Sequence, residues 1–561
     1  MADLRARAET WLADDPDPVT RAELRDLLER LPDTEAELAD RFSGPLVFGT
    51  AGLRGPLRAG PNGMNQAVVR AAAAGLVRWL DDHQAVGPVV IGYDARHGSA
   101  RFAEETARVA EGAGRRALLL SRPLPTPVLA YAVRALNAAA GVMVTASHNP
   151  PQDNGYKVYL GPALGGPGGA GAQIVPPADT EISAAIAAAG PLADVPMGEV
   201  TVDEVLGDGV VDAYLAGAVG VIAPDGPRDL TVAYTPLHGV GAQVLNDAFV
   251  RAGFPRPVPV PEQADPDPDF TTVSFPNPEE PGAMDRVLRL ADEIGADLAI
   301  ANDPDADRCA VAIRDWSGKP GSGGPGTAWR ILRGDEVGVL LADHLMRRGV
   351  TGRYATTIVS SSLLRALCGA RDLPYGETLT GFKWIVRADP DLGYGYEEAL
   401  GYCVAPEHVR DKDGITAALL IAELAAVLKA EGRGLDSRLD ELARQFGVHT
   451  TDQLSVRVDD LTDIAAMTAR LRTAPPATLL GDPVTELRDL SPATDAVTLR
   501  TDTARVVVRP SGTEPKLKAY LEVVEPVAGD EVAAARRRAA LRIADLRSEV
   551  AAALGVDLAS V

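Results

Sequence analysis

Short apolar runs alternate with helix-like segments through most of this chain of 561 residues. The runs that predict strands are VVIGYD (89–94), RALLL (116–120), AGVMVTAS (140–147), LTVAYTP (230–236), LAIAND (298–303) and YATTIVSS (354–361). Helix-like stretches separate them, for example over residues 100–112 and 242–252. Alternation at this spacing is typical of α/β units with a largely parallel sheet.

The two ends of the chain have different patterns. Leu24, Leu27, Leu28 and Leu31 recur at helical spacing, which predicts a helical extension over residues 1–40. From residue 451 onward, runs such as LSVRV, AVTLRT and ARVVVRP alternate with two helical stretches, which indicates a smaller α+β domain. We therefore predict three similar α/β domains with mixed, largely parallel sheets, followed by this smaller one. The predicted domains are 41–225, 226–330, 331–450 and 451–561.

The charge balance excludes some classes of partner. Lys and Arg number 55 and Asp and Glu 78, so the formal net charge is −23. Such a chain repels nucleic acid and acidic membrane surfaces. An anionic substrate must therefore be attracted by local cations or by a bound metal.

Cysteine usage and the N-terminus indicate a compartment. Cys309, Cys368 and Cys403 lack metal-ligand spacing, which favours a reducing environment and argues against disulfides or a zinc site. Residues 1–16 are acidic and contain no apolar signal segment. The longest apolar run, residues 417–430, is too short to cross a membrane and is interrupted by Glu423. We expect a cytoplasmic protein without a membrane partner.

The first candidate for chemistry is the segment TASHNP (145–150), directly after an apolar strand. Open α/β sheets bind their ligands at the carboxyl ends of strands. Ser147 in this segment is a candidate nucleophile, because covalent catalysis needs an exposed hydroxyl beside a group that takes its proton. Glycine does not flank Ser147 at two residues on either side, so this is not a hydrolase elbow. A polar turn closed by Asn-Pro is the alternative.

The second candidate is DPDADR (303–308), with carboxylates at Asp303, Asp305 and Asp307. Only a tightly curved loop brings all three to one centre, since alternate residues of a flat strand lie about 6.6 Å apart. Oxygen-only ligands favour Mg²⁺ or Ca²⁺, and Mg²⁺ usually completes its shell with water or phosphate. The EF-hand pattern is absent, because Arg308 stands at the sixth loop position. A solvated acidic turn is the alternative.

The third candidate is RPSGTEPK (509–516). Its arginine offers two parallel donors, its hydroxyls add others, and its glycine allows close approach of the backbone, so the segment can hold a phosphate. An ordinary turn is the alternative. Four smaller segments supply further cations and carboxylates: FGTAGLRG (48–55), GFKW (381–384), GYEEALG (395–401) and KDG (412–414).

In this order the segments resemble the α-D-phosphohexomutase family of phosphoglucomutases, phosphomannomutases and their relatives, with matches from Phe48 to Lys516. The resemblance implies four domains around a central cleft. It also implies that Ser147 is the phosphorylated serine. Asp303, Asp305 and Asp307 are then expected to hold one Mg²⁺ per chain, with phosphoserine supplying a further oxygen.

Motif by motif, the resemblance assigns further roles. Arg54, His148 and Lys157 are similar to the cations that surround the transferring phosphoryl group. The residues expected to bind substrate are Glu397 at the sugar hydroxyls, Lys383 and Lys412 as further cations, and Arg509, Ser511, Gly512 and Thr513 around the phosphate that is not being transferred.

The implied activity is a phosphosugar mutase that moves a phosphoryl group between the 1- and 6-positions of glucose or mannose phosphate. It proceeds through an enzyme phosphoserine and a bisphosphorylated sugar, with a sugar 1,6-bisphosphate as activator. We expect a monomer or a homodimer. Ala399 stands where many family members have serine, and the EEALG form resembles the subgroup that contains phosphopentomutases.

Three alternatives stay open. A phosphopentomutase would apply the same machinery to ribose or deoxyribose 1-phosphate. A metal-dependent sugar phosphatase would release inorganic phosphate. A noncatalytic sugar-phosphate sensor is expected to have lost Ser147 or one of the aspartates, and the chain retains all of them.

Overall fold

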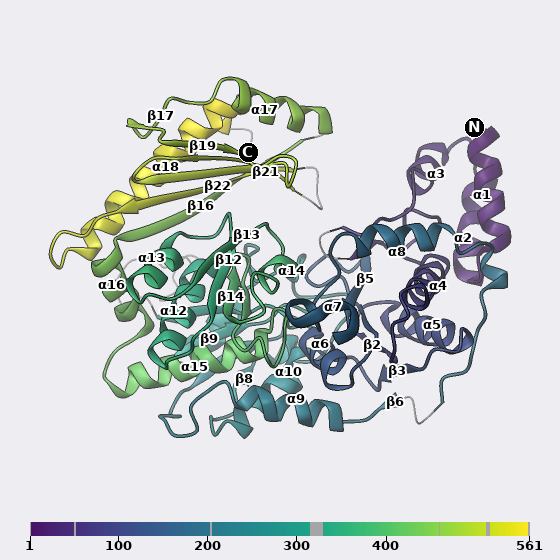
Figure 1. The fold of residues 1–561 in the computed structure, drawn as a ribbon, viewed down its shortest axis with the longest axis horizontal. Helices are drawn as coiled ribbons and strands as arrows, with labels where there is room; N and C mark the ends of the chain where they lie inside the picture. Colours follow the sequence, from purple (N-terminus) through teal and green to yellow (C-terminus); the bar gives the residue numbers. More distant parts are fainter. Residues whose placement is uncertain are drawn as a thin grey trace.

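The computed structural model describes residues 2–49, 52–201, 205–314, 329–458, 460–511 and 516–558, and Figure 1 shows its arrangement. The chain begins with three helices: α1 (Ala2–Asp14), α2 (Pro18–Glu29) and α3 (Glu35–Arg41). Asp17 caps α2 by accepting a hydrogen bond from the Val19 N–H. Leu24, Leu27 and Leu38 bury the inner faces of these helices in a small core of their own.

The first α/β unit contains a six-stranded sheet in the order β1-β5-β4-β2-β3-β6. Strands β2, β3, β4 and β6 run parallel, while β5 and β1 add an antiparallel edge. Its elements are β1 (Leu53–Pro56), α4 (Gln66–Asp82), β2 (Val89–Tyr93), α5 (Ser99–Gly112), β3 (Ala117–Leu120), α6 (Thr126–Ala135), β4 (Ala140–Val144), β5 (Asp153–Leu160), α7 (Pro162–Gly169), α8 (Ala178–Ala187), the short 3₁₀ helix η1 (Leu192–Asp194), β6 (Val205–Leu206) and α9 (Gly209–Val219).

The second unit has a five-stranded sheet in the order β11-β10-β9-β7-β8, parallel at β9-β7-β8 and antiparallel at β10 and β11. Its elements are β7 (Val232–Thr235), α10 (Gly241–Arg251), β8 (Val258–Pro259), the 3₁₀ helix η3 (Pro261–Gln263), α11 (Asp285–Glu293), β9 (Leu298–Ala301), β10 (Ala310–Arg314) and β11 (Trp329–Ile331).

The third unit has a four-stranded sheet in the order β13-β12-β14-β15, in which only β15 is antiparallel. Its elements are α12 (Gly334–Arg347), β12 (Arg353–Thr357), α13 (Leu363–Ala370), β13 (Tyr375–Thr378), α14 (Phe382–Ile385), β14 (Leu392–Glu397), β15 (Gly401–Cys403), α15 (Gly414–Ala430) and α16 (Leu435–Phe446). One apolar cluster runs through helices of all three units, including α6, α10 and α15, so these units share a continuous core.

The fourth unit is an antiparallel sheet in the order β16-β22-β21-β20-β19 with two long helices. Its elements are β16 (Val448–Arg457), α17 (Leu461–Thr473), β17 (Thr478–Leu479), β18 (Asp482–Pro483), β19 (Glu486–Asp489), β20 (Val497–Arg500), β21 (Ala504–Pro510), β22 (Lys516–Glu525) and α18 (Val532–Leu554). It has a separate core and lies above the third unit in Figure 1. Three α/β units and a smaller α+β unit confirm the predicted fold class.

Candidate active site

Ser147 lies on a tight turn that follows β4. Its φ of 53° is in the left-handed region, which is uncommon for a residue other than glycine. Two successive hydrogen bonds hold the turn in place. The Ser147 N–H donates to Thr145 Oγ1 over 2.8 Å, and the Thr145 hydroxyl donates to Asp94 over 2.6 Å. Both Thr145 and Asp94 are buried. The backbone therefore fixes the direction in which the Ser147 side chain points.

A buried arginine, Arg96, holds the outside of the same turn. Its guanidinium donates to the carbonyl oxygens of Ser147 over 2.7 Å and Pro150 over 2.8 Å, and also to those of Asn149 and Asp153. Phe270, from the second unit, lies under the guanidinium at 4.8 Å. The sequence analysis missed Arg96. Its signal was a charged residue just after β2, at the carboxyl end of a parallel strand.

The aspartate triad occupies the loop between β9 and β10. Asp303, Asp305 and Asp307 are almost completely buried, and one ligand oxygen from each lies within 4.8 Å of the others. Ala306, with a φ of 54°, provides the sharp curvature that brings alternate residues to one centre. Ser147 Oγ donates a hydrogen bond of 2.8 Å to Asp303 Oδ2, so two separate α/β units meet at this point.

Two lysines face the triad from neighbouring units. Lys157 Nζ on β5 is 2.8 Å from Asp305 Oδ2 and 3.3 Å from Asp307 Oδ2, and Lys412 Nζ is 3.1 Å from Asp307 Oδ2. Burial lowers the pKa of Lys157, but the charges of Asp305 and Asp307 outweigh it and raise the pKa overall. Both lysines are therefore charged.

The aspartates themselves differ in acidity. Burial, together with the charges of Asp305 and Asp307, raises the pKa of Asp303 well above its usual value. For Asp305, burial also raises the pKa, but Lys157 and the Thr126 hydroxyl, which donates to it over 2.7 Å, lower it overall. Thr126, at the start of α6, is a second contact that the sequence analysis missed.

The triad suits a divalent cation. Asp305 Oδ1 and Asp307 Oδ1 are buried without a hydrogen-bond partner, and such atoms carry a desolvation cost unless something compensates it. Three carboxylates, two of them with an unpartnered oxygen, form an all-oxygen donor set of the kind that Mg²⁺ prefers. The residues therefore fit the Mg²⁺ that the resemblance implies.

Arg54 and His148 complete the surroundings of Ser147. Arg54 Nη1 donates to Asn149 Oδ1 over 2.8 Å, its Nε is buried without a partner, and burial lowers its pKa to about 10. His148 Nδ1 is 3.1 Å from Ser147 Oγ. Burial, reinforced by the charges of Arg308 and Arg54, lowers the pKa of His148 well below its usual value, so the imidazole is neutral.

A loop of the third unit with two adjacent carboxylates, GYEEALG (395–401), reaches the same centre, and we call it the carboxylate loop. Glu397 ends β14, the chain reverses with a φ of 64° at Leu400, and Cys309 N–H beside the triad donates to the Leu400 carbonyl oxygen over 3.1 Å. Burial raises the pKa of Glu397 to about 7, although the charges of Lys412 and Arg308 act against it. Lys412, near the start of α15, therefore faces both Asp307 and Glu397.

Three of the predicted substrate residues have neighbours other than the residues of this centre. Lys383 on α14 is partly buried, and the charges that act on it are those of Asp179 and Arg387. Arg509, at the end of β21, is within hydrogen-bonding reach of the Tyr520 hydroxyl. Ser511 donates its N–H to the Lys516 carbonyl oxygen over 2.7 Å, while the expected partners Gly512 and Thr513 lie outside the described residues.

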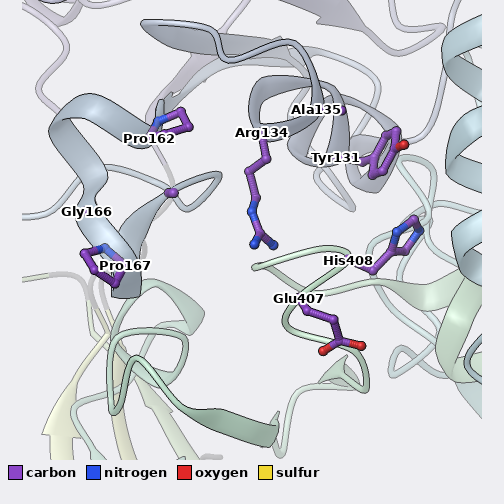
Figure 2. Close-up of a pocket in the computed structure, with 9 residues that line it drawn as sticks. Tyr131, Arg134, Ala135, Pro162, Gly166, Pro167, Glu407 and His408 are labelled. Carbon is purple, nitrogen blue, oxygen red and sulfur yellow. The ribbon is translucent and has the colours of Figure 1, made fainter.

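A cavity of about 680 Å³ lies beside the site, between α6, α7 and the loop that leads to Lys412. Arg134 extends into it and donates to the Pro406 carbonyl oxygen over 2.7 Å, and Glu407 and His408 form the opposite wall (Figure 2). Its lining contains none of the candidate site residues. The serine, aspartate and lysine side chains described above meet at the boundary of the three α/β units instead.

Comparison with known families decides the identity of this arrangement. Models of the phosphoglucomutase/phosphomannomutase family match the chain four times: domain I over residues 45–191, domain II over 212–318, domain III over 333–446 and the C-terminal domain over 454–539. The chain belongs to this family. It is an enzyme of the phosphohexomutase type, an intramolecular phosphotransferase.

Individual relatives within the family carry different names. A probable phosphomannomutase of Haemophilus influenzae is 44% identical over 468 residues, which cover 82% of this chain and 93% of its own. A mouse phosphopentomutase is 33% identical, covering 93% of this chain and 91% of its own. A solved phosphoglucomutase/phosphomannomutase family protein from Burkholderia thailandensis shares the fold, with a TM-score of 0.68 over 91% of this chain and 97% of its own at 19% identity.

Among the residues that the structure describes, no helix combines the length and the apolar character needed to cross a bilayer.

Proposed function

We propose that this family member moves a phosphoryl group between the 1- and 6-positions of glucose or mannose phosphate through a phosphorylated Ser147. The observation that carries the proposal is the 2.8 Å contact between Ser147 Oγ and Asp303 Oδ2. It brings a hydroxyl with a fixed orientation against a buried carboxylate cluster surrounded by cations. Phosphoryl transfer depends mainly on such positioning and charge balance.

The steps follow from the chemistry of the phosphate ester. Phosphorylated Ser147 gives its phosphoryl group to the free hydroxyl of a sugar monophosphate, so the P–Oγ bond breaks and a new P–O bond forms on the sugar. The attacking sugar hydroxyl loses its proton and the serine oxygen gains one, and the neutral His148, with its Nδ1 3.1 Å from Ser147 Oγ, is suited to pass this proton from one oxygen to the other. The bisphosphate then reverses its orientation within the site. Its other phosphate is transferred to Ser147 by the reverse exchange. Phosphate and proton are therefore conserved over the cycle.

The surrounding residues balance the charge. Phosphoserine carries about −1.5 to −2 charges, which the ammonium of Lys157 and the guanidinium of Arg54 offset. A Mg²⁺ at the aspartate triad, when bound, supplies further neutralisation and polarises the phosphoryl group. We assign binding of the sugar hydroxyls to Glu397, with Lys412 beside it. We assign binding of the other phosphate, the one that stays on the sugar, to a loop that contains Arg509, Ser511, Gly512 and Thr513. Lys383 is the remaining proposed substrate cation.

A pentose phosphate is the second candidate substrate. The mouse relative named phosphopentomutase, matched over 93% of this chain, favours it, as does Ala399 in the carboxylate loop. The same machinery serves both sugars, since the transferred group and the serine are common to them.

A single assay tests the proposal. The wild-type enzyme is given the 1-phosphates of glucose, mannose, ribose and deoxyribose with Mg²⁺ and a sugar bisphosphate, and isomerised product and inorganic phosphate are both measured. We expect isomerisation without net phosphate release, and its loss in Ser147→Ala but not in the control Ser183→Ala, whose hydroxyl bonds only to the Asp179 carbonyl of its own helix. Turnover near the wild-type rate in Ser147→Ala, or stoichiometric phosphate release, would overturn the proposal.

A further inference from the structure

Glu398, the carboxylate next to Glu397, is held by the turn that follows β12. Ser360 Oγ donates to Glu398 Oε2 over 2.8 Å and Thr357 Oγ1 donates to the same oxygen over 3.0 Å. Ser360 is completely buried. The carboxylate loop of the third unit is therefore tied to this turn by two hydrogen bonds to a charged acceptor, which are stronger than those between neutral groups.

The other side of the same turn is tied to the fourth unit. Ser361 Oγ donates to Glu522 Oε1 over 2.8 Å, and Arg505 donates to the Ser360 carbonyl oxygen. Arg505 and Glu522 are themselves 3.2 Å apart, and both are at least nine-tenths buried. The two residues also face each other in the register of β21 and β22. We call Glu398, Ser360, Ser361, Arg505 and Glu522 the seam network.

The same sheet face leads to the proposed phosphate-binding loop at Arg509 and Ser511, which we call the phosphate loop. Side chains alternate along a strand, so Arg509 shares the face of Arg505 on β21, and Tyr520 shares the face of Glu522 on β22. Arg509 is within hydrogen-bonding reach of Tyr520, and the negative charge of Glu398 acts on the same tyrosine. Tyr520 therefore lies within reach of Arg509 and within range of the charge of Glu398, and both loops extend from elements that the seam network joins.

We infer that Ser360, Arg505 and Glu522 are positioning residues that set the spacing between the sugar-binding carboxylates and the phosphate loop, and thereby select sugar phosphates by length. This inference rests on the proposed function. A hexopyranose phosphate has a six-membered ring and a pentofuranose phosphate a five-membered ring, so the span from C1 to the phosphate at the far end differs between them by a fraction of one C–C bond length of ~1.5 Å. A misplacement of about 1 Å is enough to change the rate of an enzyme about 10²-fold.

The separate core of the fourth unit explains why such a device is needed. The three α/β units share one apolar core, whereas the core of the fourth unit is distinct. Apolar contact is not directional, but hydrogen bonds to buried charges have defined lengths and angles. The seam network therefore fixes the register of the fourth unit on the third more narrowly than hydrophobic contact does.

The test compares two serines. Ser360→Ala removes the donor to Glu398. Ser548→Ala is the control, because its hydroxyl donates to the Ala544 carbonyl oxygen of its own helix in the fourth unit. For each variant, kcat/KM is measured on glucose 1-phosphate and ribose 1-phosphate with Mg²⁺ and a sugar bisphosphate. Thermal unfolding and the extent of Ser147 phosphorylation are recorded in parallel.

We expect kcat/KM of Ser360→Ala to fall about tenfold on the sugar that the wild type prefers and less than threefold on the other, so that discrimination narrows. Ser548→Ala keeps the wild-type ratio. A purely structural role would lower the unfolding temperature and reduce both activities equally. An unchanged ratio in Ser360→Ala would therefore overturn the inference, although the proposed function would stand. Absence of turnover by the wild type on both sugars would overturn both.

A double-mutant cycle provides the second arm. Glu522→Gln keeps the acceptor for Ser361 but removes the charge that faces Arg505. If one connected network sets the spacing, the double variant Ser360→Ala/Glu522→Gln has the same ratio of kcat/KM between the two sugars as the more severe single variant. Effects on the sugar ratio that multiply in the double variant would show that the two residues act independently, and would overturn the network.

Discussion

Ser147 Oγ donates a 2.8 Å hydrogen bond to Asp303 Oδ2, although 156 positions separate the two residues. The contact joins the end of β4 in the first unit to the β9–β10 loop in the second. Both residues are buried, so the hydrogen bond is shielded from water and costly to leave unmade. The proposed nucleophile and the proposed metal ligand are thus held in contact by the fold.

The aspartate triad predicts a thermal response to Mg²⁺. The three carboxylates repel one another, so a bound cation should stabilise the fold by an amount that rises with its concentration. We expect millimolar MgCl₂ to raise the unfolding temperature of the wild type and to have much less effect on Asp305→Asn. Differential scanning calorimetry measures this without any assay of activity.

Asp265→Asn is the control for this prediction, because Asp265 is an exposed acid of the same unit. It should respond to MgCl₂ as the wild type does. An equal rise in all three proteins would contradict the assignment of the metal to the triad.

Arg96 predicts a positioning effect. A lysine at this place keeps the charge but not the planar fork that reaches several carbonyl oxygens of the serine turn at once. We expect Arg96→Lys to lower kcat about 10²-fold, while KM for the sugar phosphate stays within about threefold, since Arg96 contacts the serine turn and not the proposed substrate loops. Arg101→Lys, an exposed arginine on α5, should behave as the wild type. A wild-type kcat in Arg96→Lys would show that the turn keeps its shape without the arginine.

The sequence predicted the parts of this site that repeat a local pattern. The apolar runs identified β2, β4, β7 and β9 because buried parallel strands are short and almost continuously hydrophobic. The triad was recognisable because three carboxylates at alternate positions are costly without a cation. The helix-like stretches predicted over residues 100–112 and 242–252 agree with α5 (Ser99–Gly112) and α10 (Gly241–Arg251), because apolar residues recur along the buried face of each helix.

The contacts that sequence reasoning missed are those that only the tertiary fold creates. Arg96 binds backbone carbonyl oxygens, which leave no side-chain pattern in the sequence. Ser361 and Glu522 are ordinary polar residues in the sequence, and their hydrogen bond forms only when the fourth unit packs on the third. Lys383 stays a prediction: the charges that act on it are those of Asp179 and Arg387, and its place at the substrate is tested only with a substrate bound.

The phosphate loop predicts a loss of substrate affinity. Arg509→Ala removes a charged donor from the proposed phosphate contact, which is worth about 1.5–3 kcal/mol. We therefore expect KM for the sugar phosphate to rise about 10- to 100-fold, with Ser147 still phosphorylated by the bisphosphate. Arg488→Ala, at an exposed arginine of the same unit, serves as the control. A wild-type KM in Arg509→Ala would remove this residue from the proposed phosphate clamp.

Glu397 predicts the pH dependence of sugar binding. Its pKa is raised to about 7, chiefly by burial, so the carboxyl is protonated below that pH and ionised above it. The ionised form accepts hydrogen bonds from sugar hydroxyls on both oxygens, and kcat/KM should therefore rise between about pH 6 and pH 8. The substrate phosphate titrates in the same range. The decisive quantity is the ratio of kcat/KM between wild type and Glu397→Gln, in which the ionisation of the substrate cancels. We expect this ratio to climb through a midpoint near pH 7, and a ratio independent of pH would assign the titration to the substrate.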